Sequence, residues 1–66
     1  MISLRFNGEH CETNVVTVDA LLVQRNIEQR GVAVAINGCV VPRSQWFSTA
    51  LNDGDEVEVV TAAAGG

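Results

Sequence analysis

Two Asn-Gly pairs constrain the fold of this 66-residue chain more than any other feature. Asn7-Gly8 and Asn37-Gly38 each stand between short runs in which apolar side chains alternate with other residues. Asparagine and glycine both tolerate positive φ, which a two-residue type I′ turn requires, so Asn-Gly is the strongest short-range signal for a β-hairpin. The sequence therefore predicts two hairpins, one at the start of the chain and one in its middle.

The first hairpin is also predicted by the alternation on both sides of its turn. Ile2, Leu4 and Phe6 alternate with polar residues, as expected for a strand with one buried face. The return strand is expected over residues 9–16, which alternate in the same way. His10 falls on the polar phase beside the turn, so we interpret it as an exposed side chain rather than a catalytic one.

A helix is predicted where the period changes, at Thr17. Val18, Leu21 and Leu22 fall at i, i+3 and i+4, which is the apolar stripe of an amphipathic helix. Thr17 is the expected N-cap, and Gly31 is the expected stop signal. These signals place one helix between the two hairpins.

The second half of the chain predicts three more strands. Residues 32–36 alternate and lead into Asn37-Gly38, and Pro42 ends the return strand or places it at a sheet edge because it cannot donate a ladder hydrogen bond. An irregular segment and a further turn then precede a closing strand over residues 56–61.

With the hairpin-like pair around Asn37-Gly38 counted as one element, the predicted order is ββαββ. A helix between two hairpins is placed across one face of a mixed sheet, which gives a two-layer α+β domain. The first and last strands can pair in parallel only after a long crossover, so we expect the closing strand at the centre. That arrangement is the β-grasp, or ubiquitin-like, fold, and we expect it over residues 1–61. The expected core includes Leu4, Leu21, Leu22, Ile36, Val57 and Val59.

Composition argues against several classes of function. Eight acidic residues against four arginines and no lysine give a formal net charge of −4, which disfavours nucleic-acid binding because that requires a basic surface. No apolar run approaches the length of a transmembrane helix and no signal peptide precedes the first strand, so we expect a cytoplasmic protein with no membrane partner. Cys11 and Cys39 lack the spacing of zinc ligands, and we expect two buried free thiols and no metal site.

The final segment, residues 62–66, consists of alanine and glycine alone. We expect a flexible tail, because chain ends are mobile unless tied down and glycines add freedom. Five extended residues reach about 17 Å, enough to carry a terminal carboxylate into a partner's cleft. Gly65 has no Cβ to clash in a narrow cleft, and Gly66 would present the carboxylate. A frayed terminus is the alternative interpretation.

Three stretches carry a resemblance to a known family: Ala35 to Trp46 (AINGCVVPRSQW), Leu51 to Ala62 (LNDGDEVEVVTA) and the final Gly-Gly. They resemble the ThiS family, the sulfur carriers of bacterial thiamine biosynthesis. The first thirty residues resemble the family only in pattern. One departure is the alanine-only approach to the diglycine, where family members often carry a bulkier residue.

The resemblance implies a carrier rather than an enzyme. An ATP-dependent, E1-like adenylating enzyme (ThiF) would activate the Gly66 carboxylate, with ATP and Mg held by that partner and no cofactor bound by this chain. A persulfide donor would then convert the terminus to a thiocarboxylate, and thiazole synthase (ThiG) would take the sulfur into the thiazole ring.

Three other functions stay open at this point. The small subunit of molybdopterin synthase has the same fold, tail and activation, although it tends to be longer. A ubiquitin-like covalent modifier would be found linked through Gly66 to lysines of its targets. A plain interaction module would keep its activity without the tail.

Val60 is apolar on the outward phase of the closing strand, which it shares with Glu56 and Glu58. We interpret these residues as a partner-docking surface beside the tail, with an acidic rim that suits a basic partner. Ala33 and Ala35 are expected to extend the same face. A single exposed valine without a function is the alternative interpretation.

Overall fold

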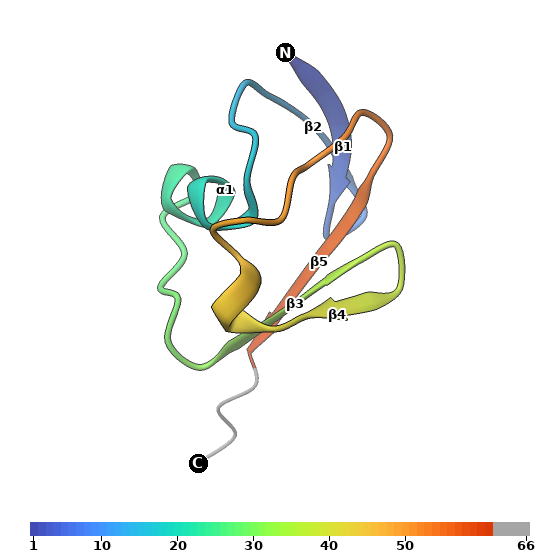
Figure 1. The fold of residues 1–66 in the computed structure, drawn as a ribbon. Helices are drawn as coiled ribbons and strands as arrows, with labels where there is room; N and C mark the ends of the chain where they lie inside the picture. The colour runs from blue at the N-terminus through green and yellow to red at the C-terminus, as the bar shows by residue number, and fades with distance from the viewer. Residues whose placement is uncertain (62–66) are drawn as a thin grey trace.

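A mixed five-stranded sheet with a helix against one face forms the domain. The structure is a computed structural model that describes residues 1–61 (Figure 1), so the expected tail over residues 62–66 lies outside the described residues. The elements in chain order are β1 (Ile2–Phe6), β2 (Glu9–Thr13), α1 (Val18–Gln24), β3 (Val32–Ile36), β4 (Cys39–Val41), the 3-10 helix η1 (Arg43–Gln45) and β5 (Glu56–Thr61).

The closing strand lies at the centre of the sheet, as predicted. The strand order is β2-β1-β5-β3-β4, with β1 and β5 parallel and the other neighbours antiparallel. In the parallel pair Phe6 lies opposite Val57, and in the antiparallel pair Val34 lies opposite Val59. The predicted β-grasp topology is therefore confirmed.

Both Asn-Gly pairs form the predicted two-residue turns. Asn7 and Gly8 have φ of 51° and 84°, and Asn37 and Gly38 have φ of 52° and 86°. Positive φ at both central residues is the signature of a type I′ turn, whose twist matches that of the strands it joins.

The side chains of the two turn asparagines also hold β5, one from each edge. Asn7 Oδ1 accepts a hydrogen bond from Val59 N at 2.8 Å, and its Nδ2 donates to Val59 O at 3.2 Å. Asn37 Oδ1 accepts from Glu56 N at 3.0 Å, and its Nδ2 donates to Asp55 Oδ1 at 3.0 Å. Each side-chain amide thus forms hydrogen bonds with β5 or the residue before it, at a point where the asparagine's own strand has already entered its turn. We call these two contacts the asparagine clasps.

The core lies between α1 and the sheet. Of the predicted core residues, Leu4, Leu21, Leu22 and Val57 are buried, while Ile36 and Val59 are half-buried and pack against that cluster. Trp46 is also buried, and its Nε1 donates to Val41 O at 2.8 Å, so the indole packs in the core without leaving its N–H unsatisfied. The buried apolar side chains are Leu4, Phe6, Val18, Leu21, Leu22, Val34, Trp46, Leu51 and Val57.

The helix is shorter than predicted at its C-terminal end. It ends at Gln24, and Gly31 (φ 77°) lies in the loop that enters β3. The earlier stop is Asn26, whose φ of 59° places it in the left-handed region that closes many helices. Ile27 packs against the core beyond this point, as expected.

Thr17 is the N-cap residue of α1, as predicted, but its side chain makes no cap hydrogen bond. Its hydroxyl donates to Asp19 Oδ1 at 2.7 Å. The N–H groups of Val18 and Asp19 instead donate to the carbonyls of Thr49 and Trp46, each at 3.3 Å. The loop after η1 thus supplies the acceptors that the first turn of a helix requires.

Both cysteines are more exposed than predicted. Cys11 is half-buried on β2 and Cys39 is exposed at the start of β4, and both are free thiols. The reason is their position, because β2 and β4 are the two edge strands of the sheet. The β2 strand also ends at Thr13 rather than at residue 16. His10 is exposed, as predicted.

Within residues 1–61, no helix is long and apolar enough to cross a membrane.

We expect Leu22→Ala to destabilise the domain by about 2–5 kcal/mol, because truncating a fully buried leucine loses apolar burial and leaves a cavity. Urea denaturation measures the change. The matched control is Val23→Ala, one residue further along α1, where the side chain is 68% exposed and the change should stay within about 0.5 kcal/mol. Equal midpoints for the two variants would contradict the assigned helix face.

Candidate functional site

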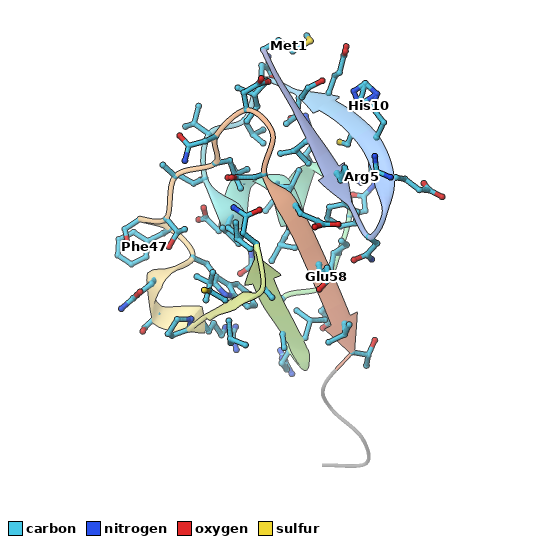
Figure 2. All side chains as sticks on the ribbon, turned by 90° about the vertical axis from the view of Figure 1, so that its right-hand side faces the viewer. Met1, Arg5, His10, Phe47 and Glu58 are labelled. Atoms are coloured by element: carbon cyan, nitrogen blue, oxygen red, sulfur yellow. The ribbon has the colours of Figure 1, made fainter. Side chains whose placement is uncertain are left out.

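The outer face of the sheet, opposite α1, carries the predicted docking residues. Along β5, Val57 is fully buried and Val59 half-buried, whereas Glu56, Glu58 and Val60 are exposed. Figure 2 looks onto this face and shows Glu58 on β5, with Arg5 on the neighbouring β1. The predicted phase of the closing strand is therefore confirmed.

An apolar groove runs across β5, β3 and β4 on this face. It has a volume of about 120 Å³ and is lined by Ala33, Val34, Ala35, Val40, Glu58 and Val60. The register explains its shape, because Ala33 lies opposite Val60, and Ala35 lies opposite both Glu58 and Val40. The small alanines form the floor and the larger side chains on β4 and β5 form the walls. We call this feature the outer groove.

Val40 belongs to the outer groove and was missed from the sequence. It is 74% exposed, more than Val60 at 59%. A usable signal was present: the two-residue turn at Asn37-Gly38 fixes the register, which places Val40 opposite Ala35 on the outward phase. Two exposed valines on opposite walls make an apolar surface that a single valine does not.

The outer face is divided into an apolar part and a polar part. The outer groove occupies β3, β4 and the end of β5, while Arg5 lies opposite Glu56 at the start of β5. Neither Glu56 nor Glu58 forms an ion pair with any residue of the part of the chain that the structure describes. Their carboxylates are therefore available to a basic surface presented by a partner.

The other predicted site residues lie beyond the described part of the chain. Gly65 and Gly66 fall within residues 62–66, so the structure places neither of them. What the structure does place is their point of attachment, because β5 ends at Thr61, next to Val60 and the outer groove. Among residues 1–61, no three His, Cys, Asp or Glu side chains form a group that could hold a metal ion.

The fold and the outer groove together define a class of protein. A β-grasp sheet whose central closing strand ends beside an exposed apolar surface is a ubiquitin-like domain. Within that class, the chain belongs to the ThiS family, whose model matches residues 4–66. The resemblance drawn from the sequence is therefore confirmed.

Solved structures agree with this assignment. The crystal structure of the thiamine biosynthesis protein ThiS from Geobacter metallireducens is similar with a TM-score of 0.81 and 30% identity, covering 89% of this chain and 91% of that one. The solution structure of a thiamine biosynthesis protein from the same organism gives a TM-score of 0.74, also at 30% identity, covering 89% of this chain and 81% of that one.

Relatives of known name are of two kinds. The sulfur carrier protein ThiS of Escherichia coli is 44% identical over 50 residues, which cover 76% of each chain. A thiazole synthase of Paramagnetospirillum magneticum is 39% identical over 66 residues, which cover 98% of this chain and 20% of the relative. This chain thus spans one fifth of the length of the thiazole synthase and about three quarters of the carrier.

We expect Val60→Asp to leave the melting temperature within a few degrees of the parent value, because the side chain is exposed. Val57→Asp on the same strand should instead unfold the domain, since it would bury an unpaired carboxylate at a site with no solvent access. Thermal melting by circular dichroism measures both. A collapse of Val60→Asp would show that the two faces of β5 have been exchanged.

Proposed function

We propose that this chain is a sulfur carrier of thiamine biosynthesis, whose Gly66 carboxylate is adenylated and then converted to a thiocarboxylate. The observation that carries the proposal is the ThiS family match, which extends to residue 66 and so includes the terminal Gly65 and Gly66. The same match favours this function over a subunit of molybdopterin synthase, a covalent modifier or a plain interaction module.

The chemistry requires activation because a carboxylate is a poor electrophile. Attack of the Gly66 carboxylate on the α-phosphate of ATP releases pyrophosphate and leaves an acyl adenylate. A persulfide sulfur then attacks the acyl carbon and AMP leaves, and a further thiol cleaves the S–S bond to yield the thiocarboxylate. The E1-like adenylating enzyme (ThiF) would hold ATP and Mg, while this chain would supply no base and no metal.

In this proposal Gly66 carries the reacting group and Gly65 gives clearance. A residue without a Cβ allows the backbone to enter a cleft that is too narrow for a side chain. The chain acts as a substrate delivered in trans rather than as an enzyme. We propose a cytoplasmic location for this reaction.

The outer groove is the proposed docking surface for the adenylating enzyme. Thr61 lies next to it, and five extended residues reach about 17 Å, so an enzyme that holds Gly66 must lie close to Val60. Glu56 and Glu58 would face a basic surface on that enzyme, which would raise the association rate and fix the orientation. Burial of Val40 and Val60 would supply the apolar part of the contact.

Thiazole synthase (ThiG) is the proposed acceptor of the sulfur. The proposal is supported by the relative from Paramagnetospirillum magneticum, a protein named thiazole synthase in which one fifth of the chain is similar to this one. Carrier-like and synthase sequences on one polypeptide suit a direct transfer between them.

Deletion of Gly66 should abolish the gain of sulfur and leave the melting temperature unchanged, because residues 1–61 form the packed domain. The test incubates parent and truncated chains with the adenylating enzyme, ATP and a persulfide donor, and measures intact mass. The parent should exchange one oxygen for one sulfur. A truncated chain that still gains sulfur would place the reaction elsewhere, with Cys11 and Cys39 as the thiols to examine.

The rate of adenylation should fall at least about tenfold in Val60→Asp, because the contact would have to desolvate a new carboxylate. ATP–pyrophosphate exchange measures this rate. The matched control is Val16→Asp, which places the same charge on a side chain of similar exposure, 64%, in the segment between β2 and α1. Equal loss in both variants would assign the effect to net charge and contradict docking at the outer groove.

A further inference from the structure

The Asn37 clasp places a neutral amide directly against a nearly buried carboxylate. Asn37 Nδ2 donates to Asp55 Oδ1 at 3.0 Å, and Asn52 N donates to Asp55 Oδ2 at 2.8 Å. Asp55 is 8% exposed, so these donors replace the water that it would otherwise bind. Removal of the Asn37 donor would leave Oδ1 without the partner that stabilises its charge.

The same asparagine precedes a glycine, which makes its side chain chemically labile. Because glycine has no side chain to obstruct it, the Gly38 amide nitrogen can attack Cγ of Asn37 when the turn opens. A C–N bond forms to give a succinimide, and the side-chain nitrogen leaves as ammonia. Water then opens the ring to aspartate or isoaspartate. The only co-reactant is water, and nothing is oxidised or reduced.

We propose that Asn37 is a modification site at which deamidation converts the clasp on β5 into a repulsive contact. In the aspartate product a carboxylate oxygen takes the place of the amide nitrogen, 3.0 Å from Asp55 Oδ1. Because Asp55 is only 8% exposed, two like charges at that distance cannot both stay ionised without opening the contact. The turn between β3 and β4 then separates from the start of β5.

Asn7-Gly8 has the same sequence and a different environment, which makes it an internal control. Asn7 Nδ2 donates to the neutral carbonyl of Val59 at 3.2 Å, and no carboxylate contacts its side chain among the described residues. Deamidation there loses one hydrogen bond and creates no pair of like charges. The structure therefore assigns different consequences to the same chemical change at the two turns.

Opening at Asn37 would also reach the outer groove. Ala33, Ala35 and Val40 belong to the hairpin that the clasp secures, whereas Glu58 and Val60 belong to β5. The loss of docking that would follow rests on the proposed function. The experiments on Asn37 measure only stability and mass. They can therefore contradict this proposal while the proposed function holds, and the proposed function can fail while this proposal holds.

The first experiment compares the melting temperatures of Asn37→Asp, Asn7→Asp and the double variant Asn37→Asp/Asp55→Asn. At about pH 7, Asn37→Asp should melt about 8 °C or more below the parent, and Asn7→Asp should lose less than half of that. The double variant should recover most of the loss, because the amide then donates from position 55 to a carboxylate at position 37. Equal losses at the two turns, or no recovery, would overturn the proposal.

The pH dependence separates charge repulsion from a merely disturbed turn. In Asn37→Asp the shared site raises the pKa of one carboxyl of the pair above its unfolded value, so stability is lost as pH rises through that raised pKa. The deficit relative to the parent should shrink by at least about half between about pH 7 and about pH 4. Asp55 is the titratable side chain in contact with Asn37, since Glu56 meets it only through backbone atoms. A deficit that does not change with pH would overturn the proposal.

The second experiment follows the parent protein itself. The folded chain is aged at mildly alkaline pH beside a urea-denatured sample, and peptide mass mapping quantifies deamidation at each Asn-Gly. Modification at Asn37 should accumulate in the folded chain at least about tenfold more slowly than in the denatured one, because the turn must open first. The modified fraction, separated by ion exchange, should melt below the unmodified one. No modification at Asn37, or equal melting of the two fractions, would overturn the proposal.

Discussion

Hydrogen bonding of β5 along both of its edges is the constraint on which the rest of the domain depends. The two hairpins are not neighbours, and β5 joins them through β1 on one side and β3 on the other. The β1 ladder stops at Val57, and the amide of Asn7 pairs with Val59 beyond it. The β3 ladder covers Val57 to Thr61, and the amide of Asn37 accepts from Glu56 N just before it. Because the joining strand comes last in the sequence, the sheet closes only through contacts between distant parts of the chain. We infer that β5 lends rigidity to the segment from which the final residues depart.

A domain of this size must divide its few surfaces between stability and recognition. One face of the sheet packs against α1 and holds the core, so it has no room for an internal site. The other face is left to solvent, and its alanines on β3 create a hollow between the valines of β4 and β5. The edge strand β4 is protected against pairing with other chains. It is three residues long and is followed by Pro42, so it exposes few backbone groups that could pair.

The parts of this structure that could be predicted from sequence are those fixed by neighbouring residues. The Asn-Gly turns, the alternation along β1, β3 and β5, and the stripe at Val18, Leu21 and Leu22 all depend on spacing of four residues or fewer. The parts that could not be predicted depend on distant segments. The Thr17 side chain makes no cap hydrogen bond, and the first N–H groups of α1 donate instead to the carbonyls of Thr49 and Trp46. Cys39 is exposed because β4 is an edge strand. The position of Val40 depends on both local and distant residues. Its turn fixes the pairing of β4 with β3, but the pairing of β3 with β5 is also needed to place Val40 across the outer groove from Val60.

In the proposed carrier, the partner is recognised at the outer groove and the reaction takes place at Gly66. This separation affects the free energy of the reaction. The outer groove offers apolar area and charge at a fixed position. Gly66, which carries the reacting carboxylate, has no side chain that an enzyme could bind. Binding energy from the groove can therefore offset the entropy of holding the terminal residues in a reactive position. Binding at the outer groove raises the rate of the reaction at Gly66 only if β5 holds Thr61 in a fixed position relative to the groove. The asparagine clasps and the central place of β5 in the sheet supply that rigid connection.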